Sequence, residues 1–436
     1  MQKKQNSTGL IWFGNDLRIH DNEVLHKAIS NNQKVIGVYC IDPRLFEKSS
    51  FGFNKLEAYR AKFLLETLLD LKKQLYNIHI SLLVSISHPE EMIPKLTQKY
   101  HVDTIYKQRE WTSEEVKTTE LVQERLLNAI KIEEVYNQFL YHPNDILTDP
   151  QKIPNVFSNF RKKLEKYVAI RPVVNIEPLS KENLIDNPTS IPTLHDLGFQ
   201  SFDIHSKTAF PFQGGETSAL ERLEEYFFQT KKLGFYKKTR NGLVGKDYSS
   251  KFSPWLANGS LSARTIYWNV KKFEHEHVNN QSTYWIIFEL IWRDYFKYIS
   301  LKYGNDIFKI GGILHREYQW SSNQESIQQW IDGETKDEFV NANMIELKET
   351  GWMSNRGRQN VASYFSKELK LDWRIGAAYF EAMLLDYDVH SNYGNWMYVA
   401  GVGNDPRDRK FNTQLQAQQY DSNHAFRNLW LQKTLF

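Results

Sequence analysis

The chain has 436 residues, of which 41% are hydrophobic and 25% charged, enough for two or three packed domains. Its formal net charge is only +3, so a nucleic-acid site would need a local basic patch. The single cysteine, Cys40, excludes a disulfide framework and a cysteine metal cluster, and it indicates a reducing compartment. Residues 1–10 hold no apolar signal region, and no apolar run reaches the roughly 18 residues of a membrane span. We therefore expect a cytoplasmic protein without membrane attachment.

The first third of the chain alternates between two hydrophobic patterns. Short apolar, β-rich runs occupy residues 10–13, 35–41, 78–84 and 104–106. Amphipathic helical stretches, residues 56–75 and 113–127 among them, separate these runs. Such alternation predicts a Rossmann-like α/β domain with a parallel sheet over residues 1–140.

The remainder of the chain divides into a linker and a helical region. Residues 141–206 are rich in Pro, Asn and Asp and predict a linker that wraps a domain surface, interrupted by one helix at residues 157–167. Beyond Gly215 the apolar residues recur at three- and four-residue intervals, which predicts an all-α domain over residues 207–436. The clearest helical stretches are residues 218–228, 262–273, 283–301, 358–370 and 372–385.

Several common catalytic devices are absent from the sequence. There is no Walker A loop and no G-x-S-x-G elbow, and residues 401–406 begin like a dinucleotide fingerprint but lack its last glycine. His275 and His277 are two residues apart on a predicted helix and point to different sides, so we predict no metal site. The 12 tryptophans are unusual, and either a bulky core or a specific function explains them.

Six blocks of sequence are more specific. They read WFGNDLR at 12–18, ELIWRDY at 289–295, GWMSNRGR at 351–358, DWR at 372–374, DYD at 386–388 and SNYGNW at 391–396. In order and spacing they resemble the photolyase/cryptochrome family over essentially the whole chain, and the cryptochrome DASH branch most. The resemblance implies a blue-light flavoprotein, with an N-terminal antenna domain and a helical domain that binds FAD and carries the catalytic site.

The resemblance also implies which residues hold the flavin. The hydroxyl-rich, basic turn at residues 249–253 suits a pyrophosphate, and Arg358 and Asp386 match an ion pair along the flavin ring. Asn392 matches the residue that faces flavin N5. An N-capping turn and an ordinary buried ion pair are the alternatives. The full set of cofactor-binding residues is Tyr236, Ser249, Ser250, Lys251, Phe252, Ser253, Glu289, Trp292, Arg293, Asn355, Arg358, Asp386, Asp388 and Asn392.

Three tryptophans match the family's electron relay, which carries electrons from the surface to the photoexcited flavin. They are Trp396, Trp373 and Trp320. Such a relay needs oxidisable rings in near contact. The alternative is that the three rings only fill the core.

Damaged DNA is the partner that the resemblance implies, with a flipped pyrimidine dimer contacted by Glu289, Trp292 and Asn355. Gln359 and Tyr398 stand where duplex-acting photolyases usually carry Met and Trp, and both match cryptochrome DASH. Polar groups there reduce the energy for extruding a paired lesion, so dimers in single-stranded or looped DNA are the expected substrate of a monomeric, light-dependent lyase. A duplex-active photolyase and a non-repairing photoreceptor that binds DNA remain alternatives.

A second chromophore is expected between the domains. DASH-like proteins generally bind methenyltetrahydrofolate, and Glu110 and Glu115 are the carboxylates nearest to the expected position. Both residues also fit ordinary acidic positions at a helix N-terminus.

Overall fold

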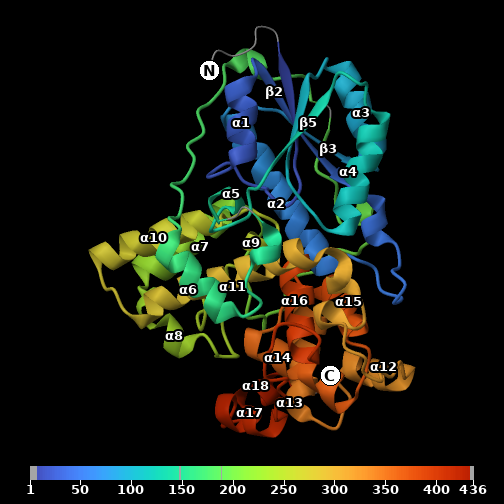
Figure 1. The fold of residues 1–436 in the computed structure, drawn as a ribbon, viewed down its shortest axis with the longest axis vertical. Helices are drawn as coiled ribbons and strands as arrows, with labels where there is room; N and C mark the ends of the chain where they lie inside the picture. Colours follow the sequence, from blue (N-terminus) through green and yellow to red (C-terminus); the bar gives the residue numbers. More distant parts are fainter. Residues whose placement is uncertain (1–6, 147–148, 188, 433–436) are drawn as a thin grey trace.

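The computed structural model describes residues 7–146, 149–187 and 189–432. An α/β part holds the N-terminal third, and a helical part holds the C-terminal half (Figure 1). This arrangement confirms the predicted fold class.

The α/β part is built on a parallel sheet in the order β3-β2-β1-β4-β5. Its strands are β1 (Thr8–Trp12), β2 (Lys34–Ile41), β3 (Leu82–Ile86), β4 (Thr104–Gln108) and β5 (Lys131–Val135). The connecting helices are α1 (Glu23–Asn31), α2 (Ala58–Asn77), α3 (Pro89–Lys99) and α4 (Ser113–Arg125). Buried residues of α1 and α2 share one core with the sheet, and those of α3 and α4 share another. Both faces are therefore covered, as a parallel sheet requires.

The structure corrects the predicted strands at two places. The third strand begins at Leu82, because Ile78 and Ile80 belong to the turn that ends α2, where His79 has a left-handed φ of 63°. The edge strand β5 was not predicted, since its sequence KIEEV has no apolar run. Charged residues are common on edge strands, where they discourage pairing with another chain.

The motif after β1 joins the two parts of the molecule. Arg18 is buried and donates to the carbonyl oxygens of Gly259 (2.8 Å) and Asn137 (3.0 Å). Gly259 has a φ of 74°, and a Cβ there would lie 2.0 Å from the carbonyl oxygen of Asn15, so only glycine fits. The backbone N–H groups of residues 19 and 20 donate to Glu216 at the start of the helical part.

The expected linker, residues 141–206, follows both parts of the molecule. Its helices α5 (Pro143–Ile146) and α6 (Phe157–Tyr167) lie beside the helical part. The chain then returns along the α/β part as an irregular segment (green in Figure 1). There the side chain of Asn183 bonds to both backbone groups of Val35 (2.8 and 2.9 Å). Residues 147, 148 and 188 of this stretch lie outside the described residues, and the exact domain boundaries stay a prediction.

The helical part begins at α7 and continues to α18. Its helices are α7 (Glu216–Glu224), α8 (Tyr236–Thr239), α9 (Ser253–Ala257), α10 (Ala263–Glu276), α11 (Gln281–Tyr303), α12 (Gln324–Asp332), α13 (Glu338–Thr350), α14 (Asn355–Ser363), α15 (Trp373–Met383), α16 (Val389–Ala400), α17 (Thr413–Tyr420) and α18 (Ala425–Leu431). π-helical turns at Glu225–Gln229 and Tyr364–Glu368 extend α7 and α14, so the sequence pattern continues past the ends of both helices.

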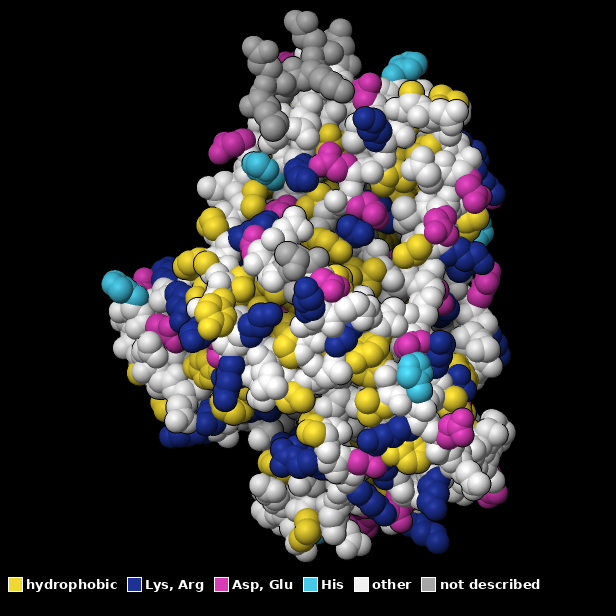
Figure 2. Space-filling model, in the orientation of Figure 1, with side chains coloured by type: hydrophobic (Ala, Val, Ile, Leu, Met, Phe, Trp, Pro, Cys, Tyr) yellow, Lys and Arg dark blue, Asp and Glu magenta, His cyan; other side chains and the backbone are white. Residues whose placement is uncertain are grey.

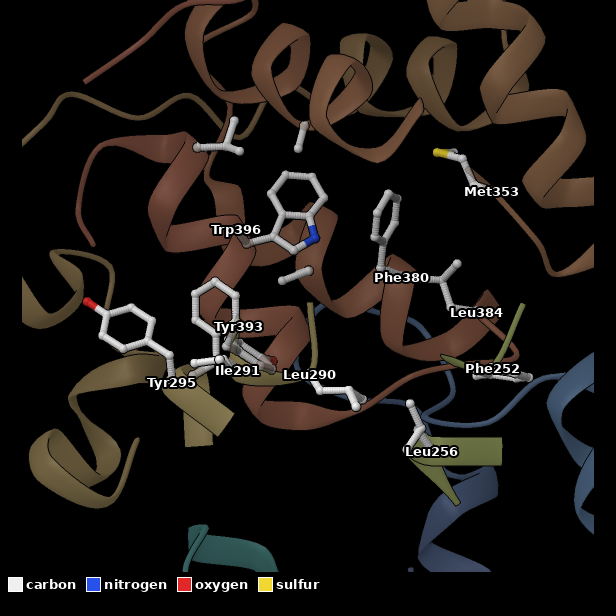
Figure 3. Packing of buried hydrophobic residues seen from close by; sticks show 14 of the residues in the cluster. Phe252, Leu256, Leu290, Ile291, Tyr295, Met353, Phe380, Leu384, Tyr393 and Trp396 are labelled. Atoms are coloured by element: carbon white, nitrogen blue, oxygen red, sulfur yellow. The ribbon is translucent and has the colours of Figure 1, made fainter. Parts of the chain in front are cut away.

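A large aromatic core holds these helices together. Trp255, Trp330, Trp373 and Trp396 are among its largest fully buried side chains. In Figure 3 the indole of Trp396 lies among hydrophobic side chains with Phe380 beside it, at a centroid distance of 5.1 Å. The core therefore uses tryptophan as bulk, whatever else some of these rings do.

Candidate functional site

A cavity of about 560 Å³ opens between α9, α11, α14 and α16. It brings together nearly all of the residues that the sequence singled out for binding the cofactor and DNA. The predicted residues that line it are Tyr236, Ser249, Ser250, Lys251, Phe252, Ser253, Glu289, Trp292, Arg293, Asn355, Arg358, Gln359, Asp386, Asp388 and Tyr398. Asn392 does not line it: its buried amide donates to the carbonyl oxygen of Ala377 (3.0 Å).

One wall of the cavity is the polar turn at residues 249–253. Arg222 on α7 is buried and donates to the carbonyl oxygens of Ser249 and Ser250, both at 3.2 Å. This contact gives both carbonyl groups of the turn a buried hydrogen-bond donor. Sequence analysis missed Arg222, which has the pattern of an exposed charge on an amphipathic helix.

Lys251 is the unusual member of this turn. It has a left-handed φ of 64°, and its ammonium lies 3.2 Å from the ring centroid of Tyr248 and 4.6 Å from that of Trp352. Within the described residues this ammonium has no hydrogen-bond partner. Burial lowers the pKa of Lys251 well below its usual value, and burial raises the pKa of nearby Glu346 to about 8. A buried cation without a partner fits the phosphate of a bound cofactor.

Two largely buried ion pairs, each with one partner more exposed than the other, line this cavity or its wall. Arg358 and Asp386 pair at 2.9 Å, and the Arg358 Nε also donates to the carbonyl oxygen of Met353 (2.9 Å). Lys297 and Asp388 pair at 2.7 Å, with side chains only 4% and 11% exposed. Burial would raise the pKa of Asp388, but the charge of Lys297 brings it well below its usual range. The cavity thus holds fixed charges of both signs, which suits a cofactor with several different polar groups.

The cavity mouth carries the residues expected to contact DNA. Glu289 pairs with Arg240, and burial raises the pKa of its carboxyl. Trp292 stacks on Phe157 of α6 with centroids 3.6 Å apart, and it meets Tyr398 edge-on at 6.0 Å. Sequence analysis missed the role of Phe157, because the residue comes from the expected linker.

The rim of the cavity is basic, although several lysines of the neighbouring sequence are paired or buried. Residues 231–251 hold seven basic side chains and one acid. In the structure Lys232 and Lys246 form ion pairs with Asp247 and Glu225, and Lys251 is turned into the interior. Arginines at the cavity itself complete the rim: Arg240, Arg356 and Arg409. Figure 2 shows Lys and Arg side chains lying among hydrophobic ones over the neighbouring α6, α8 and α10.

The three tryptophans expected to form an electron relay differ in burial. Trp396 and Trp373 are buried, whereas Trp320 is half-buried. The residues after Trp320 and before Trp373 pair as Ser321 and Leu371 in a short bridge, which brings the two segments together. The ring neighbours of Trp396, Trp373 and Trp320 include Phe380, Tyr393 and Tyr318 respectively.

A second cavity of about 550 Å³ lies between the α/β and helical parts. Glu110 and Glu115 both line it, with α2 on one side and α16 on the other. Burial raises the pKa of Glu110 to about 7, and Gln108 donates to its carboxyl (2.7 Å). Arg293 and Asp388 line both cavities, so a shared wall separates them.

Residues 7–146, 149–187 and 189–432 show neither a metal-binding cluster nor a membrane-spanning helix. In that part of the chain no cluster of three or more His, Cys, Asp or Glu side chains is arranged to hold a metal ion. None of the helices described there has the length and apolar character to cross a membrane.

Comparison with known proteins identifies the class of this fold and site. The DNA photolyase family model matches residues 9–179, and the model for the FAD binding domain of DNA photolyase matches residues 285–434. Cryptochrome DASH of Gloeobacter violaceus is 45% identical over 97% of this chain and 85% of its own length. Cryptochrome DASH, chloroplastic/mitochondrial, of Arabidopsis thaliana is 44% identical over 99% of this chain and 77% of its own. The crystal structure of Synechocystis cryptochrome superposes with a TM-score of 0.93 at 43% identity, covering 99% of this chain and 89% of that one.

The chain is therefore a member of the photolyase/cryptochrome family, a class of FAD-binding flavoproteins. Within that family it belongs with the cryptochrome DASH proteins. These matches confirm the resemblance seen in the sequence blocks.

Proposed function

We propose that this chain uses blue light and FAD to split cyclobutane pyrimidine dimers in single-stranded or looped DNA. The observation that carries the proposal is one cavity with two kinds of wall. Its inner wall presents the serine turn, Lys251 and the Arg358–Asp386 pair, and its mouth presents Glu289, Trp292 and a basic rim. The two walls suit a flavin inside and a flipped lesion outside.

The inner wall supports FAD binding through the chain's own residues. When bound, FAD would supply the light absorption and the electron that opens the cyclobutane ring. The partnerless ammonium of Lys251 and the hydroxyl groups of the turn would hold the pyrophosphate. Arg358, fixed by Asp386, would place a positive charge along the flavin ring.

The mouth supports binding of the lesion. The Glu289 carboxylate would accept hydrogen bonds from the pyrimidine edge; it pairs with Arg240, which partly offsets the rise that burial causes in its pKa. Trp292 would cover the apolar face of the dimer, and the stack on Phe157 fixes the plane of its ring. Asn355 lines the same cavity and is exposed.

The preference for single strands rests on the polar character of this mouth. Gln359 accepts a hydrogen bond from Arg356 (2.9 Å), and Tyr398 meets Trp292 only by its edge. These polar groups offer less apolar contact to a flipped dimer than Met and Trp would. Extruding a paired lesion costs a few kcal/mol of unstacking, which an unpaired lesion largely avoids.

The relay would reduce the bound flavin before repair. The burial of the three rings supports this role: Trp320 is half-buried and would accept electrons near the surface, whereas Trp373 and Trp396 are buried in the helical part. Trp373 also contacts the ring of Tyr393 at a centroid distance of 6.1 Å.

We also propose that the second cavity holds a folate antenna, methenyltetrahydrofolate. The half-buried Glu110 carboxyl, with its raised pKa, would accept hydrogen bonds from the amino group of the pterin. Glu115 already bonds to Thr112 and would line the cavity beside it. Glu110→Gln should weaken the binding of the folate while FAD stays bound. The measurement is the near-ultraviolet absorbance of folate that co-elutes with the protein on gel filtration.

One experiment tests the repair proposal. The reduced holoprotein is illuminated with an oligonucleotide that carries one thymine dimer, first single-stranded and then paired with its complement. We expect loss of the dimer in the single strand and little in the duplex, with Glu289→Gln as a variant that keeps FAD but repairs slowly. Equal repair of the duplex would favour a duplex-active photolyase. No repair with intact flavin would favour a photoreceptor that binds DNA without repairing it.

A further inference from the structure

Helix α11 carries a row of aromatic side chains that continues beyond the cavity. Trp285, Phe288 and Trp292 recur at three- and four-residue intervals and are all half-buried. Phe288 and Trp292 line the cavity, whereas Trp285 does not, so the row leads from the mouth toward the start of the helix. Trp285 stacks on Phe288 with centroids 4.7 Å apart and an interplanar angle of 27°.

Cationic side chains lie over the outer two rings of this row, Trp285 and Phe288. The Lys237 ammonium lies 4.4 Å from the ring centroid of Trp285, and the Arg240 guanidinium lies 5.9 Å from it. The Arg161 guanidinium from α6 lies 5.6 Å from the ring centroid of Phe288. Aromatic rings interleaved with cations beside a groove are the usual composition of a surface for single-stranded nucleic acid.

We propose that Trp285 and Phe288 form a stacking platform for an unpaired base next to the lesion. The inference rests on the proposed function, since it assigns the nucleotide beside the dimer in the same site. On binding, the base takes the place of the cations on the rings, and Lys237 and Arg161 pair with the phosphates of the strand. This site is distinct from the contact of Trp292 with the dimer itself.

A stacked base should displace the cations from these rings, because stacking is the stronger of the two contacts. Stacking of a base on an aromatic side chain is about two to three times stronger than an exposed cation–π contact. The displaced cations also gain phosphate partners, so they lose little. A paired flanking base would first have to leave its own stack, so the platform acts only on unpaired strands. It therefore adds a second source of single-strand preference to the polar mouth.

The platform is tested in the dark by a double-mutant cycle, in which a protein substitution is combined with an abasic site in the DNA and the binding affinity is measured. Binding of the FAD-loaded protein to a single-stranded oligonucleotide with one dimer is measured by fluorescence anisotropy. Each of the flanking nucleotides on both sides is replaced in turn by an abasic site. At one flanking position we expect the wild-type affinity to fall about ten-fold. In Trp285→Leu the same abasic site should lower affinity less than about two-fold, because the stacking partner is already gone.

The controls separate stacking from general damage to the fold. Trp268→Leu removes a 40% exposed tryptophan on α10 and should behave like the wild type. Phe288→Leu repeats the test from the other ring, so the result does not depend on one variant. Retention of FAD absorbance checks that each variant is folded.

The outcomes also separate this inference from the proposed function. If every abasic site lowers the affinity of wild type, Trp285→Leu and Phe288→Leu equally, the platform is wrong, even where light repairs the single-stranded dimer normally. If light repairs no dimer but the abasic site acts only with Trp285 in place, the repair proposal is wrong and the platform stands.

Discussion

Replacing Lys297 by methionine removes one half of the Lys297–Asp388 ion pair, whose side chains are 4% and 11% exposed. Its ammonium lies 2.7 Å from the carboxylate of Asp388, in the wall between the two cavities. Methionine keeps most of the volume of the lysine stem but leaves Asp388 without its nearest positive charge. Burial raises the pKa of Asp388, and the variant lacks the Lys297 charge that lowers it most. We therefore expect this pKa to rise from well below to above its usual value.

The size of the effect follows from what Asp388 keeps. Removing one partner of a buried pair typically costs about 3–5 kcal/mol. Asp388 retains the backbone N–H of Ser391 (2.8 Å) and the nearby charge of Arg293, which places the loss near the lower end, about 3 kcal/mol at pH 7. In the wild type the depressed pKa stabilises the fold above the unfolded value of about 4. In the variant the raised pKa reverses this, so the deficit should shrink as pH falls from 7 toward 5.

Urea denaturation of the FAD-loaded protein, followed by tryptophan fluorescence, measures this change, since most tryptophans lie in the helical part. The matched control is Lys297→Met with Asp388→Asn, which removes both charges and should return to within about 1 kcal/mol of the wild type. A Lys297→Met deficit below about 1 kcal/mol at pH 7, or one that does not change with pH, would refute the reasoning.

Three further changes have defined outcomes. Lys251→Met should lower the FAD that stays bound through gel filtration, because the pyrophosphate loses its buried cation; full retention would contradict that assignment. Trp373→Phe should slow photoreduction of bound FAD, followed by absorbance under blue light, and a normal rate would argue against the relay. Gln359→Met combined with Tyr398→Trp should raise duplex repair relative to single-strand repair by roughly three- to ten-fold, since apolar contact with the flipped dimer increases; an unchanged ratio would place the preference elsewhere.

The cavity was predictable from sequence where its residues sit on regular helices. Glu289 and Trp292 are three residues apart on α11 and therefore share a face of it. Asp388 is the N-cap of α16, and its carboxylate accepts from the N–H of Ser391, so its position is fixed by the helix itself. The roles of these residues were implied by the resemblance of their sequence blocks to a known family, and the local geometry agrees with their sharing one cavity.

The parts that sequence analysis missed depend on contacts between distant segments. Arg222 has no motif around it, yet it fixes the carbonyl groups of residues 249 and 250. Glu346 looks like a surface residue of α13 and is in fact buried beside Lys251. Phe157 meets Trp292 from another helix, across more than a hundred residues of chain. Only the packed structure brings these pairs together, because no periodicity encodes them.

The shared wall decides which variants can separate the two proposed cofactors. Arg293 donates to the carbonyl oxygens of Gln138 (2.5 Å) on one side and Leu256 (3.0 Å) on the other, and it lines both cavities. A change at Arg293 or Asp388 would therefore disturb FAD and folate sites together, and loss of both would identify neither. Glu110 lines only the inter-domain cavity and Ser250 only the helical one. Loss of near-ultraviolet absorbance alone in Glu110→Gln, beside loss of FAD alone in Ser250→Ala, would assign one cofactor to each cavity.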